Sequence, residues 1–210
     1  MVTMQFLAGT YTENTSSEGL YCFGLGNASE PYLEPLSLDL VNPSFLCAHP
    51  FLAKVYVVEE TGADFGGGRV SCLRPDGAAL IHSEKHATGG NDPCHLDVSP
   101  DGRWLAVANY SSGSVALFSL SKEGEIDQRQ GSITHLSAFE ARKHESGRHL
   151  ERQEAPHAHF VKWIDASSLL ICDLGNDEVY CYEGDPSGLS ESEEPVEQPG
   201  QNHGLSLIHI

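Results

Sequence analysis

One short layout recurs three times along this chain, and it constrains the fold more than any other feature. Each copy is a Pro-led apolar run, a turn, and a second apolar run that ends in a polar residue. The copies begin at Pro43, Pro93 and Pro156. A third β-rich run and a turn follow each copy, and a partial copy lies at residues 5–23. Short β-rich runs that repeat in this way are typical of propeller blades.

The repeat predicts an all-β chain folded as an incomplete β-propeller, with about four blades in 210 residues. The 21 Gly and 11 Pro are spread along the chain, so turns should be frequent and helices scarce. The alternative is a two-sheet β-sandwich, which does not account for the repeated Pro-to-polar layout. We expect a single partial propeller domain over residues 1–210, with an irregular tail outside the repeat from residue 185.

The formal net charge of −18 limits the partners of this chain. Nucleic acid and anionic lipid both require a basic face, so neither is an expected partner. Six cysteines without a CxxC pair, most of them in apolar runs, indicate buried free thiols in a reducing compartment. The first residues lack a basic start, and no run approaches the ~20 apolar residues of a membrane span. We therefore expect a cytoplasmic protein without a membrane partner.

Polar residues at the ends of the predicted strands indicate a binding site. Asn109 follows His95 at the same spacing at which Asp173 follows His159. This equal spacing predicts that the two histidines share one position in successive blades, and that Glu60, Asn109 and Asp173 share another. Inner strands of blades line a central channel, so such residues should converge there. Alternatively, turn amides satisfy the carboxylates and His95 is a core histidine.

A local basic region could attract an anionic ligand despite the negative net charge. Segment 124–152, predicted as a long loop, contains five of the twelve basic residues: Arg129, Arg142, Lys143, Arg148 and Arg152. His157 and His159 follow it and alternate with Ala158, so both should point to the same side of one strand.

Six short motifs, taken in order, are similar to signatures of a known family. They are Gly9–Thr12, Asn42–Leu46, Val58–Glu60, Ala108–Tyr110, Arg152–His159 and Asp173–Asp177. Together they resemble the lactonase family of seven-bladed β-propellers. The resemblance implies a cytosolic hydrolase that opens 6-phosphoglucono-1,5-lactone in the pentose phosphate pathway, without a metal or other cofactor. The family also includes relatives that act on muconate lactones by intramolecular addition and elimination.

The resemblance covers residues 5 to about 185 and implies three further blades, which carry another arginine and glutamate of the cleft. Here the acidic segment 191–197 follows instead, and the final residues 205–210 match nothing expected. We therefore expect an N-terminal fragment of such a ring, whose catalytic site is incomplete if early and late blades share it.

Lactone hydrolysis needs an activated water and a stabilised oxyanion. We assign His159 or His157 as the general base and Arg152 as the clamp for an anion or the oxyanion. Glu60 is an alternative base that the sequence does not rank against the histidines. The expected substrate-binding residues are His95, Asn109, Tyr110, Gln153, Asp173 and Arg148.

Three alternatives remain open from the sequence. His157 and His159 with Glu60 and Asp173 could hold a divalent ion. A propeller can also serve as a non-catalytic scaffold that binds proteins, although few aromatic anchors are evident here. Finally, half a ring leaves blade faces and strand edges open, so the chain could be inactive.

Overall fold

The computed structural model describes residues 4–25, 32–36, 38–76, 79–142, 149 and 151–188. These residues form four antiparallel sheets, which we label A to D in chain order. Sheet A contains β1 (Met4–Gly9), β2 (Leu20–Leu25) and β3 (Tyr32–Leu36). Sheet B contains β4 (Leu46–Ala48), β5 (Val55–Glu59), β6 (Arg69–Asp76) and β7 (Ala79–Ala87). Sheet C contains β8 (Pro93–Val98), β9 (Trp104–Asn109), β10 (Ser114–Leu120) and β11 (Ile126–Thr134), and sheet D contains β12 (Ala158–Trp163), β13 (Ser168–Asp173) and β14 (Glu178–Glu183).

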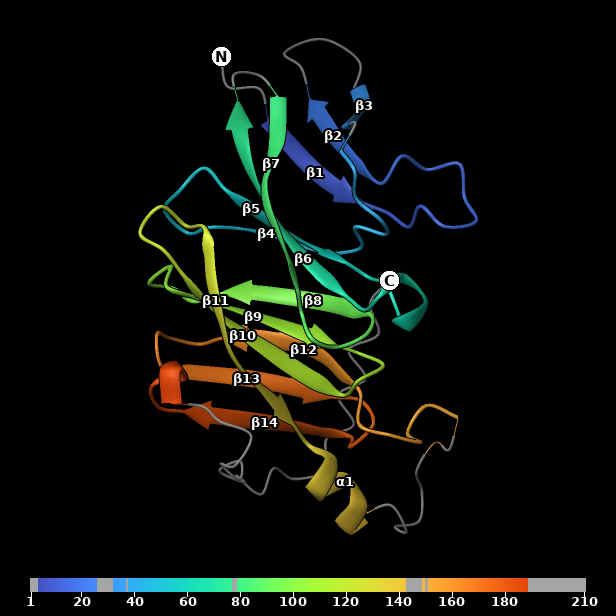
Figure 1. The fold of residues 1–210 in the computed structure, drawn as a ribbon, viewed down its shortest axis with the longest axis vertical. Coiled ribbons are helices and arrows are strands. Elements are labelled where there is room, and N and C mark those ends of the chain that lie inside the picture. The colour runs from blue at the N-terminus through green and yellow to red at the C-terminus, as the bar shows by residue number, and fades with distance from the viewer. Residues whose placement is uncertain are drawn as a thin grey trace.

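The sheets lie face to face in chain order, with sheet A at the top of Figure 1 and sheet D near the bottom. Side chains of β9 show why this stacking is stable. Leu105 and Val107 pack in the core between sheets B and C, whereas Trp104, Ala106 and Ala108 pack in the core between sheets C and D. Successive side chains of a strand point to opposite faces, so an almost entirely apolar strand is buried on both sides. Four stacked sheets confirm the incomplete propeller and exclude the two-sheet sandwich.

The pairing register corrects the predicted equivalence of polar residues. One strand position is shared by Val57 of sheet B, Val107 of sheet C and Ile171 of sheet D. In the first strand of each sheet, their pairing partners are Leu46, Leu96 and Val161. Two residues further along these strands stand Glu59, Asn109 and Asp173. The prediction that Glu60 shares this position is wrong by one residue.

The predicted equivalence of His95 and His159 is also wrong. His95 pairs with Ala108, whereas the residue that pairs at the same position in sheet D is Phe160. The turn between β12 and β13 is one residue shorter than the turn between β8 and β9. An equal count along the chain therefore reaches different positions in the two sheets.

The repeat assigned no residues to the outer strands β7 and β11. β11 occupies residues 126–134, within the segment predicted as a long loop, and most of its residues are exposed or half-buried. α1 (Leu136–Arg142), the one α-helix in the described part of the chain, follows directly and lies at the bottom of Figure 1. The predicted tail lies outside the described residues from residue 189 onward, so it stays a prediction.

Candidate active site

The strands β5, β9 and β13 end at the same edge of the stack, and several polar side chains gather there. Glu60 and Tyr110 directly follow β5 and β9, and Tyr11 lies two residues beyond β1. The backbone N–H of Tyr110 donates to the carbonyl of Asp92, 2.9 Å away, which joins the loop before β8 to this edge. We call Tyr11, Glu60, Asp92, Tyr110 and His159 the mouth.

Glu60 is a half-buried carboxyl in the mouth. Burial raises the pKa of this carboxyl above its ordinary value; the hydroxyls of Ser44 and Tyr11 offset part of the shift, and the charge of Asp92 adds to it. Burial and the nearby Glu60 also raise the pKa of Tyr11. A carboxyl shifted in this direction exchanges protons closer to neutral pH, as a general base requires. The mouth therefore offers Glu60 as a base.

His157, one of the two histidines assigned as base, is poorly placed for that role. It is only 5% exposed, and its ring lies flat on the ring of Tyr110, with centroids 4.4 Å apart. Nδ1 is 3.0 Å from the carbonyl of Tyr110, and Nε2 is 3.0 Å from Oε1 of Glu154. Both ring nitrogens therefore already have partners. The stacked ring and the contact with the Tyr110 carbonyl indicate that His157 holds Tyr110 in place. These contacts favour a supporting role for His157 over the predicted role of base.

His159, the other histidine assigned as base, belongs to the mouth. It is half-buried and meets the edge of the Tyr110 ring at 84°, with centroids 5.6 Å apart. Its backbone carbonyl accepts a hydrogen bond from the thiol of Cys94. The two histidines therefore both contact Tyr110, but only His159 presents a partly accessible ring.

Three predicted substrate-binding residues are buried instead. Asp173 and Asn109 are each 1% exposed, and the carboxylate of Asp173 accepts hydrogen bonds from the backbone N–H groups of His157 and Asn176. His95 is 8% exposed and lies between two phenylalanine rings, Phe45 and Phe160. This burial favours the alternatives of a core histidine for His95 and a turn-bound carboxylate for Asp173 over a direct role in substrate binding.

Three further residues assigned to the site precede His157 in the sequence: Arg148, Arg152 and Gln153. Arg152 is exposed, and its backbone N–H donates to the carbonyl of His149. Gln153 donates from Nε2 to the carbonyl of Leu174 and accepts at Oε1 from the N–H of His149, so it fastens a loop. Arg148 lies outside the described residues.

Sequence reasoning missed Tyr11, Asp92 and His135. Tyr11 falls inside the Gly9–Thr12 motif, so a signal for it was present. His135 is buried and its Nδ1 lies 2.9 Å from Oδ2 of Asp173, a contact between distant parts of the chain that no local pattern reveals.

A family model described as "Lactonase, 7-bladed beta-propeller" matches residues 5–202, nearly the whole chain. The chain belongs to this lactonase family. The 6-phosphogluconolactonase of Bacillus subtilis is 28% identical over 194 residues, which are 91% of this chain and 52% of that protein.

Two solved structures agree with the lactonase fold. A candidate 6-phosphogluconolactonase from Bacteroides fragilis is 31% identical with a TM-score of 0.72, covering 88% of this chain and 49% of that one. The periplasmic gluconolactonase of Pseudomonas aeruginosa is 30% identical with a TM-score of 0.71, covering 87% and 50%. This lactonase chain thus spans about half the length of the relatives it matches.

The predicted metal alternative finds no support at the mouth of this lactonase chain. Within the described ranges, one group of three possible ligands lies close enough to hold an ion: Cys72, Glu84 and Glu125. None of these belongs to the proposed set, and Lys54 already forms an ion pair with Glu125.

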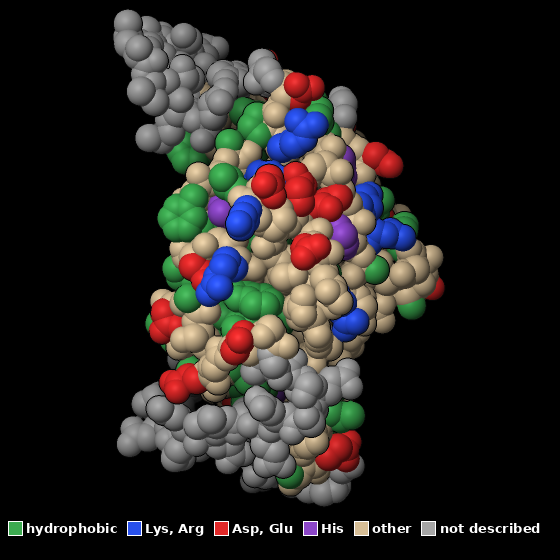
Figure 2. All heavy atoms as spheres, turned by 60° about the vertical axis from the view of Figure 1, so that its left-hand side comes forward, with side chains coloured by type: hydrophobic (Ala, Val, Ile, Leu, Met, Phe, Trp, Pro, Cys, Tyr) green, Lys and Arg blue, Asp and Glu red, His purple; other side chains and the backbone are tan. Residues whose placement is uncertain are grey.

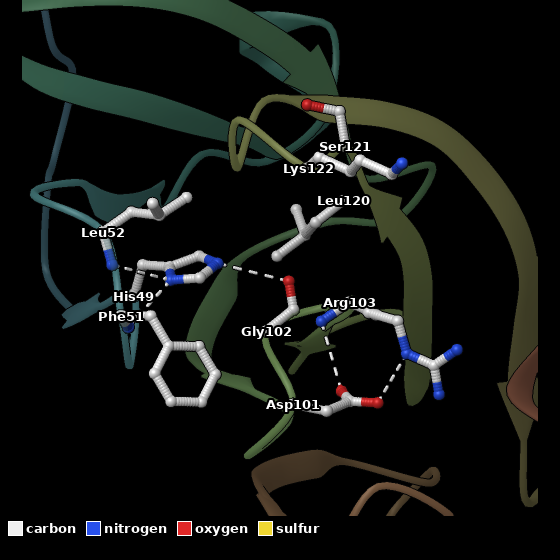
Figure 3. Close-up of a pocket in the computed structure, with 9 residues that line it drawn as sticks. All are labelled: His49, Phe51, Leu52, Asp101, Gly102, Arg103, Leu120, Ser121 and Lys122. Carbon is white, nitrogen blue, oxygen red and sulfur yellow. Dashed lines mark hydrogen bonds and ion pairs between the residues drawn. The ribbon is translucent and has the colours of Figure 1, made fainter.

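A hollow of about 300 Å³ lies at the opposite end of the strands, between turns of sheets B and C (Figure 3). His49 is one of its polar lining residues. Its Nδ1 accepts from the N–H groups of Phe51 and Leu52, and its Nε2 lies 3.2 Å from the carbonyl of Gly102. Asp101 and Arg103 pair with each other across the rim. Because His49, Asp101 and Arg103 already have partners, the mouth is the stronger candidate for the active site.

One face of the molecule carries mixed charge. On the face shown in Figure 2, basic side chains are interspersed with acidic ones. Among the described residues, no helix is long and apolar enough to cross a membrane.

Proposed function

We propose that this protein hydrolyses a sugar lactone, 6-phosphoglucono-1,5-lactone, to the open acid as a step of the pentose phosphate pathway. The observation that carries the proposal is Glu60, a half-buried carboxyl with a raised pKa at the mouth of a lactonase-family propeller. The names of the relatives from Bacillus subtilis and Bacteroides fragilis support the phosphorylated substrate. The anionic lactone is the small-molecule partner we expect, and the six free thiols favour the cytoplasm.

In the proposed reaction, the Glu60 carboxylate takes a proton from a water molecule as the water oxygen attacks the lactone carbonyl carbon. The tetrahedral intermediate then collapses, the bond from carbon to ring oxygen breaks, and the ring oxygen receives the proton from Glu60. The exposed guanidinium of Arg152 binds the phosphate or the oxyanion, because it can donate two parallel hydrogen bonds. His159 and Tyr110 contact the sugar hydroxyls at the rim of the mouth.

The test is turnover of freshly prepared 6-phosphoglucono-1,5-lactone, measured above its uncatalysed opening, with unphosphorylated glucono-1,5-lactone as the matched comparison. We expect the phosphorylated lactone to give the larger kcat/KM, and R152M to reduce that preference about tenfold or more. Equal rates for both lactones would refute the phosphate assignment. Turnover of neither lactone by the protein would refute the proposed function.

A further inference from the structure

The segment between β11 and β12 begins at His135 and ends at His157, and a single carboxylate holds both ends. Oδ2 of Asp173 lies 2.9 Å from Nδ1 of His135. Oδ1 of the same residue accepts the backbone N–H of His157 at 2.8 Å. The carboxylate of Asp173 is fully buried, as is almost all of the His135 side chain. One side chain of β13 therefore closes both ends of this long segment.

His135 is itself held on every side. Its Nε2 lies 3.0 Å from the hydroxyl of Tyr182, and its ring is stacked on Tyr180 with centroids 3.6 Å apart. Its carbonyl accepts from the side chain of Asn176 and from the N–H of Phe139 in α1. The side chain cannot turn away from Asp173 without breaking these contacts, so the start of the segment is fixed.

The end of the segment carries Arg152, and the residues at the end of β13 hold it too. Leu174 accepts from Nε2 of Gln153 at 3.1 Å, and its N–H donates to the carbonyl of His157 at 2.8 Å. Arg152 and Gln153 both donate their N–H groups to the carbonyl of His149, which closes a turn. The position of Arg152 thus depends on residues 173–174.

We propose that Asp173 is a positioning residue that, together with His135, holds residues 151–157, which include Arg152, against the mouth. The consequence for substrate rests on the proposed function, because there Arg152 binds the anionic group of the lactone. Glu59 occupies the same strand position in sheet B and provides the matched control. Its carboxylate binds the N–H of Val41, Ser71 Oγ and Lys85, and so fastens sheet B without contacting this segment.

The experiment is hydrogen–deuterium exchange of the protein, followed by mass spectrometry of peptides covering residues 151–157 and strands β5 and β9. H135L removes the donor to Asp173, whereas H135N keeps a nitrogen donor near the place of Nδ1 and loses the same ring stacking. We expect H135L and D173N to speed exchange of residues 151–157 about tenfold or more, relative to β5 and β9. H135N should restore most of that protection, and E59Q should leave residues 151–157 within about twofold of the parent.

Two exchange results would overturn the proposal. Unchanged exchange of residues 151–157 in both D173N and H135L would show that the hydrogen bonds of Asp173 are not needed to hold these residues. Equal acceleration in β5, β9 and residues 151–157 would show only a general loss of stability. Kinetics add a second readout: D173N should raise KM for the lactone more than it lowers kcat, and a fall in kcat at unchanged KM would overturn the positioning role. The exchange result holds even for a protein without lactone turnover, so failure of the two proposals can be told apart.

Discussion

The imidazole of His157 lies parallel to the phenol ring of Tyr110, at an interplanar angle of 10° and with ring centroids 4.4 Å apart. The same imidazole bonds the Tyr110 carbonyl, so two contacts hold the end of β9 to the start of β12. We predict that H157F, which keeps an aromatic ring there, lowers the free energy of unfolding by about 1–2 kcal/mol through the lost hydrogen bonds. Urea denaturation measures this change. An unchanged midpoint would show that these bonds contribute nothing to stability.

The raised pKa of Glu60 predicts a particular pH profile. The carboxyl must be ionised to act as a base, so kcat/KM should fall as the pH is lowered through the pKa of Glu60. This pKa lies above the ordinary glutamate value of 4.5. D92N removes a neighbouring negative charge and should move this acid limb to lower pH. Asp92 has φ of 53°, a left-handed conformation that asparagine adopts readily, so the variant should fold. Initial rates from pH 4 to 8 would reveal the shift, and an acid limb that D92N leaves in place would count against Glu60 as the titrating group.

The same shift has a consequence for stability. The folded protein holds the Glu60 proton more tightly than the unfolded chain, because its folded-state pKa is raised. Stability should therefore decrease as pH rises from the unfolded pKa through the folded pKa, and the penalty should be complete above it. E60Q carries no charge and should flatten this decline. Thermal unfolding at several pH values tests the sign: a parent protein that gains stability from Glu60 over this window would contradict the assignment.

Glu59 should matter far more for stability than an exposed ion pair. Its side chain is fully buried and pairs with Lys85 at 3.0 Å. Removing it in E59A leaves the Val41 N–H and Ser71 hydroxyl without their acceptor, and we expect a loss of about 3–5 kcal/mol. The control is K162M, which removes the exposed lysine of the pair with Asp97 and should cost about 0–1 kcal/mol. Similar losses for the two variants in urea unfolding would contradict the structure.

Gly175, two residues after β13, lies against the backbone of Ala155 and His157 in the segment that carries Arg152. A Cβ built there would lie 1.8 Å from the carbonyl oxygen of Ala155, so G175A must displace backbone. We expect a large loss of stability, about 2 kcal/mol or more, and faster exchange of residues 151–157. G62A is the control, since its Cβ would meet Asp92 Oδ1 at an ordinary 3.4 Å. Parental stability in G175A would mean that this packing is looser than the structure shows.

The repeat was readable from sequence because each blade must bury both faces of its inner strands, which leaves apolar runs and turns at regular spacing. The outer strand β11 escaped notice because most of its side chains are polar and exposed or half-buried. Such a strand is defined by its pairing with β10, and no local pattern records that pairing.

The site was only partly predictable. Glu60, Tyr110, His159 and Arg152 belong to motifs, and the first three lie at the mouth. Asp173 looked like a ligand because it is a carboxylate at a strand end, but it binds backbone N–H groups and His135. A one-residue difference between two turns also displaced the counted equivalence of His95 and His159, and spacing alone cannot detect such a difference.

We propose that Glu60, and not His157, is the base of lactone hydrolysis. The most direct test measures turnover of fresh 6-phosphoglucono-1,5-lactone by the protein and by its E60Q and H157Q variants, after subtracting the uncatalysed rate. We predict that E60Q lowers kcat about 100-fold or more, whereas H157Q stays within about tenfold of the parent. An E60Q variant as active as the parent, or a loss confined to H157Q, would contradict the claim.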